Sequence, residues 1–185
     1  MAEQYGVIIG IDPSSTKTGW SLMVNGVIYD AGEVHVKKRK QITPHRTTEM
    51  AQKLCSQLKR YSFSRLAMKG AGPPYRPGQL TKEIIIEYPS AKVYGNRPGT
   101  GLAVYGDAVG VVRSSLGDEF GEFEIHYVTP DTWCGGHSKV KRRMIAEKEW
   151  PTMADTKDSG GDIADAIALA VWFRDGGKSR CLAGG

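Results

Sequence analysis

Two carboxylates of this 185-residue chain end apolar segments that have the composition of buried strands. Asp12 follows the β-branched run Tyr5–Ile11, and Glu87 follows Ile84–Ile86. Taken singly, each acid has an ordinary structural explanation. The sequence Asp-Pro-Ser-Ser favours a turn at Asp12, and a glutamate at a strand end usually marks the point where the strand meets solvent. A chemical role for either acid therefore depends on what lies beside it.

Asp162 and Asp165 stand at the start of the apolar segment that runs to Phe173. Three residues apart on a helix, they share one face, about 60° apart. Asp162 complements the helix dipole as a first-turn acid, three residues after Ser159. Asp165 has no such explanation, because this helix is apolar all round and must be packed on all sides. We expect Asp165 to be at least partly buried, and buried carboxylates are rare unless paired or metal-bound.

Convergence of these four acids would create a site for divalent cations. Parallel strands present their carboxyl ends to one edge of the sheet, where α/β proteins bind ligands. Like charges about 5 Å apart repel by roughly 3 kcal/mol per pair at an effective dielectric near 20, so either protons or cations must neutralise them. An all-oxygen set poor in histidine favours Mg²⁺ or Mn²⁺ over zinc. Two such ions about 3.5–4 Å apart activate water and stabilise the leaving oxygen in phosphodiester hydrolysis.

The elements that must position these acids form a mixed α/β domain. Asn25–Gly26, between Gly19–Val24 and Val27–Val34, predicts a type I′ hairpin and, with Tyr5–Ile11, a three-stranded meander. Apolar periodicity predicts helices over 48–61, 98–116, 138–150 and 162–173, and strands near 84–86 and 123–127. Such alternation indicates a partly parallel sheet covered on both faces.

Segments rich in glycine and proline are expected to be irregular. Residues 62–81 contain Gly70, Pro73 and Pro77 and are predicted to form a long connection. We expect one domain over residues 1–175, followed by a flexible tail at 176–185. The helix over 98–116 has an apolar seam and two glycines one turn apart, Gly106 and Gly110. It is expected either to pack on the sheet of its own domain or to form a dimer interface.

Charge and cysteine content point to a polyanionic partner in a reducing compartment. The formal net charge is +5, the pI is about 9.1, and basic residues concentrate at Lys37–Lys40 and Lys139–Arg143. The run Lys37–Lys40 is equally well explained as a solvated hairpin flank. Three widely spaced cysteines argue against a disulfide framework. No apolar run approaches the roughly 20 residues of a membrane span, so we expect a cytoplasmic protein without a membrane partner.

Three segments together resemble the motifs of RuvC-type Holliday-junction resolvases, which belong to the ribonuclease H-like superfamily. Gly10–Trp20, GIDPSSTKTGW, resembles the family's first-strand motif. Ile84–Glu87 resembles its fourth-strand acid, and Asp162–Ala168 resembles its last-helix motif of two acids before small residues. Each motif is weak alone, but they occur in the family's order from about Tyr5 to Phe173.

The resemblance implies a ribonuclease H-like fold with a mixed five-stranded sheet flanked by helices on both faces. It implies a homodimer that makes paired incisions in four-way DNA junctions, using two Mg²⁺ ions per active site, which Mn²⁺ replaces. The implied catalytic residues and metal ligands are Asp12, Glu87, Asp162 and Asp165. The resemblance and the basic segments place DNA contacts at Tyr88, Lys139, Lys141, Arg142, Arg143 and Lys38. The connection over 62–81 is longer than expected for the family, which leaves junction docking and sequence preference open.

Other functions remain open at this point. A nuclease of this kind could act on other branched DNA or on RNA. A phosphotransferase of the actin and sugar-kinase superfamily also opens with a strand, an aspartate and a phosphate-binding turn, but it usually needs two such domains. A DNA-binding module without catalysis would have no reason to keep buried aspartates. Trp133 is expected to be a core or rim aromatic, and His126 and His137 are not expected to be metal ligands.

Overall fold

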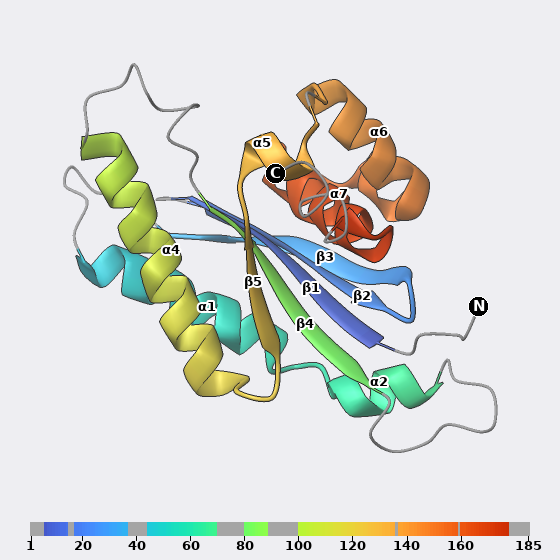
Figure 1. Cartoon of the computed structure of the whole chain (residues 1–185), viewed down its shortest axis with the longest axis horizontal. Coiled ribbons are helices and arrows are strands. Elements are labelled where there is room, and N and C mark those ends of the chain that lie inside the picture. The colour runs from blue at the N-terminus through green and yellow to red at the C-terminus, as the bar shows by residue number, and fades with distance from the viewer. Residues whose placement is uncertain are drawn as a thin grey trace.

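A computed structural model of the chain describes residues 6–14, 17–36, 44–69, 80–88, 100–135, 137–158 and 160–177. Its centre is an open five-stranded sheet with the strand order β3-β2-β1-β4-β5 (Figure 1). The strands are β1 Gly6–Pro13, β2 Lys17–Val24, β3 Val27–His35, β4 Thr81–Glu87 and β5 Glu124–Val128. The helices are α1 Pro44–Leu58, α2 Phe63–Lys69, α4 Thr100–Glu119, α5 Pro130–Trp133, α6 Lys139–Glu149 and α7 Asp162–Arg174, with a 3₁₀ turn, η1, at Pro151–Asp155.

The sheet is mixed, as the sequence predicts. β1, β2 and β3 pair in an antiparallel meander, whereas β4 runs parallel to both β1 and β5. At the β2–β3 turn Asn25 has φ 50° and Gly26 has φ 81°. Two successive positive φ angles define a type I′ turn, so the predicted hairpin is confirmed.

Helices cover both faces of the sheet (Figure 1). On one face α1 and α4 lie against a large core cluster that includes Ile9, Leu54 and Leu116. On the other face α7 packs on β1 and β2, and Ile163 and Ile167 are buried there. α6 packs on the outer side of α7. The two-sided burial of α7 explains why its sequence has no polar face.

The helix α4 uses its apolar seam within its own domain. Val109, Val112 and Leu116 are buried in the core cluster beneath α1 and α4, so these residues are not available to a dimer interface. A side chain added at Gly106 or Gly110 would meet nothing within 4 Å. The glycines therefore lie on the open face of the helix, and dimerisation through that face stays a prediction. The side chains at 102 and 105 lie outside the described residues.

Part of the predicted irregular connection is helical. α2 occupies Phe63–Lys69, where we expected only loop, because Phe63 and Ala67 are buried against the core. α5 and η1 were also not predicted, since helices of four and five residues are too short to show periodicity.

Residues 70–79, Lys38 and Cys181 lie outside the described residues. Cys55 and Cys134 are free thiols, and no described helix is long and apolar enough to cross a membrane.

Candidate active site

Strand alternation directs Asp12 and Glu87 toward the α7 face of the sheet. Ile11 pairs with Ile86 in the parallel β1–β4 ladder, and both are buried on the α1 and α4 side. Because successive side chains of a strand point to opposite faces, the next residue on each strand points toward α7. Asp12 and Glu87 therefore stand at the carboxyl ends of neighbouring strands, on the same face.

Two glycines allow the start of α7 to approach these strand ends. A Cβ atom at Gly10 would lie 2.3 Å from the carbonyl oxygen of Ala166, and one at Gly19 would lie 2.0 Å from that of Asp162. The Ser21 hydroxyl donates a 2.8 Å hydrogen bond to the Ala166 carbonyl. The helix backbone thus rests directly on the sheet, which brings the first turn of α7 over the strand ends.

The N-terminus of α7 is capped by a residue that the sequence analysis missed. The Asp158 carboxylate accepts hydrogen bonds from the backbone N–H groups of Gly161 and Ala164, both at 3.0 Å. Asp158 thereby satisfies donors that the first turn of a helix leaves unpaired. Asp162 lies in the first turn of α7, as predicted, where its charge complements the helix dipole. Its oxygen lies 3.9 Å from the Lys17 ammonium.

The four acids share one electrostatic environment. Burial raises the pKa of Asp12 well above its usual range, and the charges of Glu87, Asp165 and Asp162 raise it further, while Lys139 lowers it. Burial also raises the pKa of Asp162, against the opposing charge of Lys17. The repulsion expected from the sequence is therefore present at Asp12.

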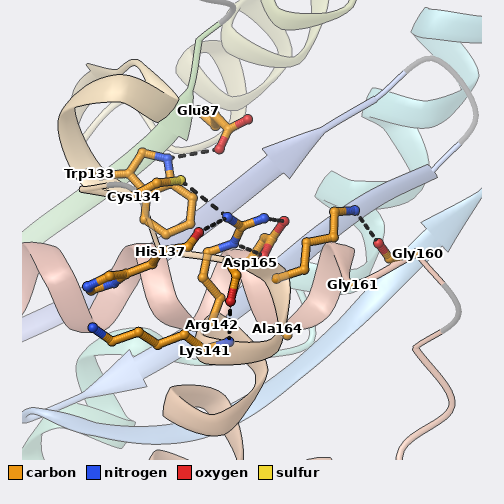
Figure 2. A network of polar contacts seen from close by, with 12 residues as sticks. Glu87, Trp133, Cys134, His137, Lys141, Arg142, Gly160, Gly161, Ala164 and Asp165 are labelled. Carbon is orange, nitrogen blue, oxygen red and sulfur yellow. Dashed lines mark hydrogen bonds and ion pairs between the residues drawn. The ribbon is translucent and has the colours of Figure 1, made fainter. Parts of the chain in front are cut away.

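Asp165 is buried, as predicted, and it is bound by an arginine (Figure 2). Arg142 of α6 donates from Nε and Nη2 to the two carboxylate oxygens at 2.5 and 3.0 Å. Its Nη1 donates to the His137 carbonyl at 2.8 Å. The predicted contact of Arg142 with DNA stays a prediction. In the structure Arg142 binds partners inside the protein, because it lies on the inward face of α6 together with Ile145 and Ala146. That spacing of three and four residues is the sequence signal that would have identified it.

Glu87 is held by the indole of Trp133 (Figure 2). The Nε1–H group donates a 2.8 Å hydrogen bond to a Glu87 carboxylate oxygen, and the ring is buried. The Arg142 guanidinium lies over the same ring, 5.7 Å from its centroid. Trp133 is thus a core aromatic, as expected, but its polar edge orients a predicted metal ligand. Two of the four acids are fixed in this way by side chains from α5 and α6.

Comparisons with known proteins bear on the fold. No protein-family profile and no curated protein sequence matches the chain. Among solved structures, Thermus thermophilus RuvC in complex with a Holliday junction substrate superposes with a TM-score of 0.66 at 15% identity, over 96% of each chain. A second Thermus thermophilus RuvC structure gives 0.60 at 14% identity, over 95% of this chain and 96% of that one. The yeast mitochondrial Holliday junction resolvase Ydc2 gives 0.54 at 12%, over 96% and 80%.

The chain has the RuvC fold. The predicted fold class is therefore confirmed over nearly the whole chain, although the sequence identities are low. In this chain the parallel β1–β4 pair and the close contacts of Gly10 and Gly19 with the α7 backbone hold the helix against the sheet.

Three of the remaining predicted DNA contacts lie on α6, and one of them, Lys139, is close enough to the acids for its charge to act on Asp12. Lys141 is exposed on α6, and Lys139 is also exposed there, with its ammonium donating to the Gly160 carbonyl at 2.8 Å. Arg143 pairs with Glu147 at 2.8 Å on the same helix. Lys38 lies outside the described residues. A DNA contact by any of these residues stays a prediction.

Tyr88 is joined by two residues that the sequence analysis did not identify. It is 45% exposed and follows Glu87 directly. Its ring packs edge-on against Tyr127 of β5, with centroids 6.1 Å apart, and the Arg113 guanidinium lies 5.8 Å from the Tyr127 centroid. The sequence does not show that Tyr127 lies beside Tyr88, because that depends on the pairing of β4 with β5.

A compact group of possible metal ligands lies on β4 and β5, away from the four predicted acids. Single ligand atoms of Glu83, Glu124 and His126 lie within 4.8 Å of one another, and His126 Nε2 is 2.5 Å from Glu83. Glu83 precedes Glu87 by four residues, so the group sits toward the opposite end of the strand. Among the described residues, the oxygens of the four predicted acids form no group as tight as this one.

Proposed function

We propose that this chain is a Holliday-junction resolvase, a metal-dependent endonuclease that makes paired incisions in four-way DNA junctions. The observation that carries the proposal is the meeting of three elements: Asp12 and Glu87 end neighbouring parallel strands on one face, and the first turn of α7 brings Asp162 and Asp165 over them. The same fold is found in a RuvC captured with a Holliday junction substrate.

The donor set fits divalent cations. All four side chains are carboxylates, and their mutual repulsion and burial raise the pKa of Asp12. A cation relieves both effects, and hard oxygen donors favour Mg²⁺, with Mn²⁺ as a substitute. We propose that the four acids hold two ions. Bound there, the ions supply an activated water and stabilisation of the leaving oxygen.

The residues around the acids prepare them for this role. Trp133 orients Glu87, and Arg142 orients Asp165, so neither carboxylate must be ordered when the substrate arrives. The contacts of Gly10 and Gly19 with the α7 backbone fix the distance between helix and strands. Preorganised ligands reduce the entropy lost on reaching the reactive arrangement.

We further propose that DNA lies across the surface formed by Lys139, Lys141 and Tyr88. Ammonium groups at the site edge suit phosphate contacts, and an exposed tyrosine next to Glu87 suits contact with a base or sugar. Coordinated cuts in two strands of a junction require two active sites, which favours a two-fold homodimer whose symmetry matches the junction. We propose a cytoplasmic location from the cysteine content.

The test is cleavage of labelled four-way junctions with Mg²⁺, with Mn²⁺ and with a chelator. Asp12→Asn, Glu87→Gln, Asp162→Asn and Asp165→Asn should each lose cleavage by orders of magnitude while still binding junctions. Glu122→Gln is the control, because it makes the same chemical change on an exposed side chain that belongs to neither group of possible metal ligands. A variant of the four that cuts at the wild-type rate would remove its residue from the site.

A substrate panel separates the alternatives. Linear duplex, forked DNA and RNA–DNA hybrids are compared with four-way junctions under the same conditions. Preferential cutting of a fork or a hybrid would assign the chain to another nuclease activity. If no substrate is cut in the presence of metal, a DNA-binding module without catalysis is favoured. Hydrolysis of ATP would favour a phosphotransferase.

A further inference from the structure

Arg142 is held in place at the acid site by several partners. Two nitrogens bind Asp165, a third donates to the His137 carbonyl at 2.8 Å, and the guanidinium lies over the Trp133 ring (Figure 2). The side chains of Arg142 and Asp165 are only 12% and 11% exposed. The ion pair is therefore fixed, and little water screens it.

The other described cations near the acids are more loosely placed. The Lys17 ammonium is 3.9 Å from Asp162, and its side chain is 24% exposed. Lys139 is exposed, and its ammonium binds a backbone carbonyl instead of a carboxylate. Because water and salt screen exposed charges much more than buried ones, Arg142 is the least screened positive charge beside Asp165, whereas Lys139 acts on Asp12 and Lys17 on Asp162. A guanidinium also stays charged throughout the working pH range.

We propose that Arg142 is a counter-charge built into the acid site, which fixes the carboxylate of Asp165 and weakens the binding of divalent cations. The inference rests on the proposed function, because it takes the acids as cation ligands. A carboxylate offers about four lone-pair positions, and Arg142 occupies two of them, so Asp165 can serve the arginine and a cation together. The positive charge of Arg142 lowers the affinity of the site for cations, and its two hydrogen bonds hold the Asp165 carboxylate in one orientation.

The experiment is a titration of the free protein with Mn²⁺, followed by electron paramagnetic resonance, without DNA. Arg142→Gln removes the charge, and the dissociation constant for Mn²⁺ should fall by about tenfold or more, since a unit charge is only weakly screened in a half-buried site. Arg142→Lys keeps the charge and should stay within about threefold of the wild type. Lys148→Gln is the matched control, because it removes one exposed charge from the same helix and should change affinity by less than about threefold.

Two results would overturn the inference. Unchanged or weaker Mn²⁺ binding by Arg142→Gln would leave Arg142 with a structural role only, because loss of structure cannot tighten binding. Equal tightening in Arg142→Lys would mean that charge is not the cause. Near-ultraviolet circular dichroism checks folding, and if Arg142→Gln does not fold, Arg142→Met must give the tightening instead.

Failure of the inference differs from failure of the proposed function. If Asp12→Asn binds Mn²⁺ as well as the wild type does, the four acids are not the cation site, and the proposed metal-dependent nuclease activity at these acids is refuted. If Asp12→Asn loses Mn²⁺ binding while Arg142→Gln does not gain affinity, only the role of Arg142 is refuted.

Discussion

Gly19→Ala should separate the acids on α7 from those on the strands. The added Cβ would lie 2.0 Å from the Asp162 carbonyl oxygen, whereas ordinary contacts begin at 3.4 Å, so about 1.4 Å of movement is needed. The obstructing atoms belong to the backbone, so a side-chain rotation cannot relieve the clash. Overpacking of this kind costs about 1–3 kcal/mol of stability. A displacement near 1 Å can lower a catalytic rate by about 10²-fold.

The assay combines urea unfolding with the rate of Mg²⁺-dependent junction cleavage. Gly110→Ala is the control: a Cβ there meets nothing within 4 Å, and replacing glycine inside a helix should stabilise by about 0.5–1 kcal/mol without changing the rate. The reasoning is refuted if Gly19→Ala unfolds at the wild-type urea concentration and cleaves at the wild-type rate. Lost stability with full activity would mean that the acids do not depend on this contact.

Three further predictions concern charge, DNA binding and assembly. Because the pKa of Asp12 is raised in the folded state, ionisation of its carboxylate destabilises the fold as pH rises above the unfolded value of about 4. Asp12→Asn should therefore melt at a higher temperature than wild type at pH 7 and lose that advantage below about pH 4; equal melting at pH 7 would contradict this. The double variant Lys139→Ala with Lys141→Ala should lower the log–log salt slope of junction binding by about 2, and an unchanged slope would count against both contacts. A Cβ at Gly110 meets nothing within 4 Å in its own chain, so Gly110→Arg should leave the fold intact. If two protomers pair through this face, the bulky charge should separate them and give monomers by light scattering; an intact dimer would place the interface elsewhere.

Local rules determined much of the scaffold from the sequence. Asn25–Gly26 requires two positive φ angles, so its hairpin followed from residue type alone. The apolar runs before Asp12 and Glu87 predicted two buried strands, and a period of two residues placed both acids on one face once the strands were paired in parallel. The all-round apolar character of the last helix correctly predicted that Asp165 is buried. Each of these inferences depends on neighbours within a few positions.

Only the tertiary structure decided which groups hold the acids. Arg142 is 23 residues from Asp165, and Trp133 is 46 residues from Glu87. Whether such pairs meet depends on how α5 and α6 pack beside α7, which no local period encodes. The spacing of Arg142 with Ile145 and Ala146 predicts that it lies on the inward face of α6, but it does not predict which carboxylate that face meets. The direction of Arg142 was fixed by the burial of the helix face that it shares with Ala146, because that apolar face had to pack against α7.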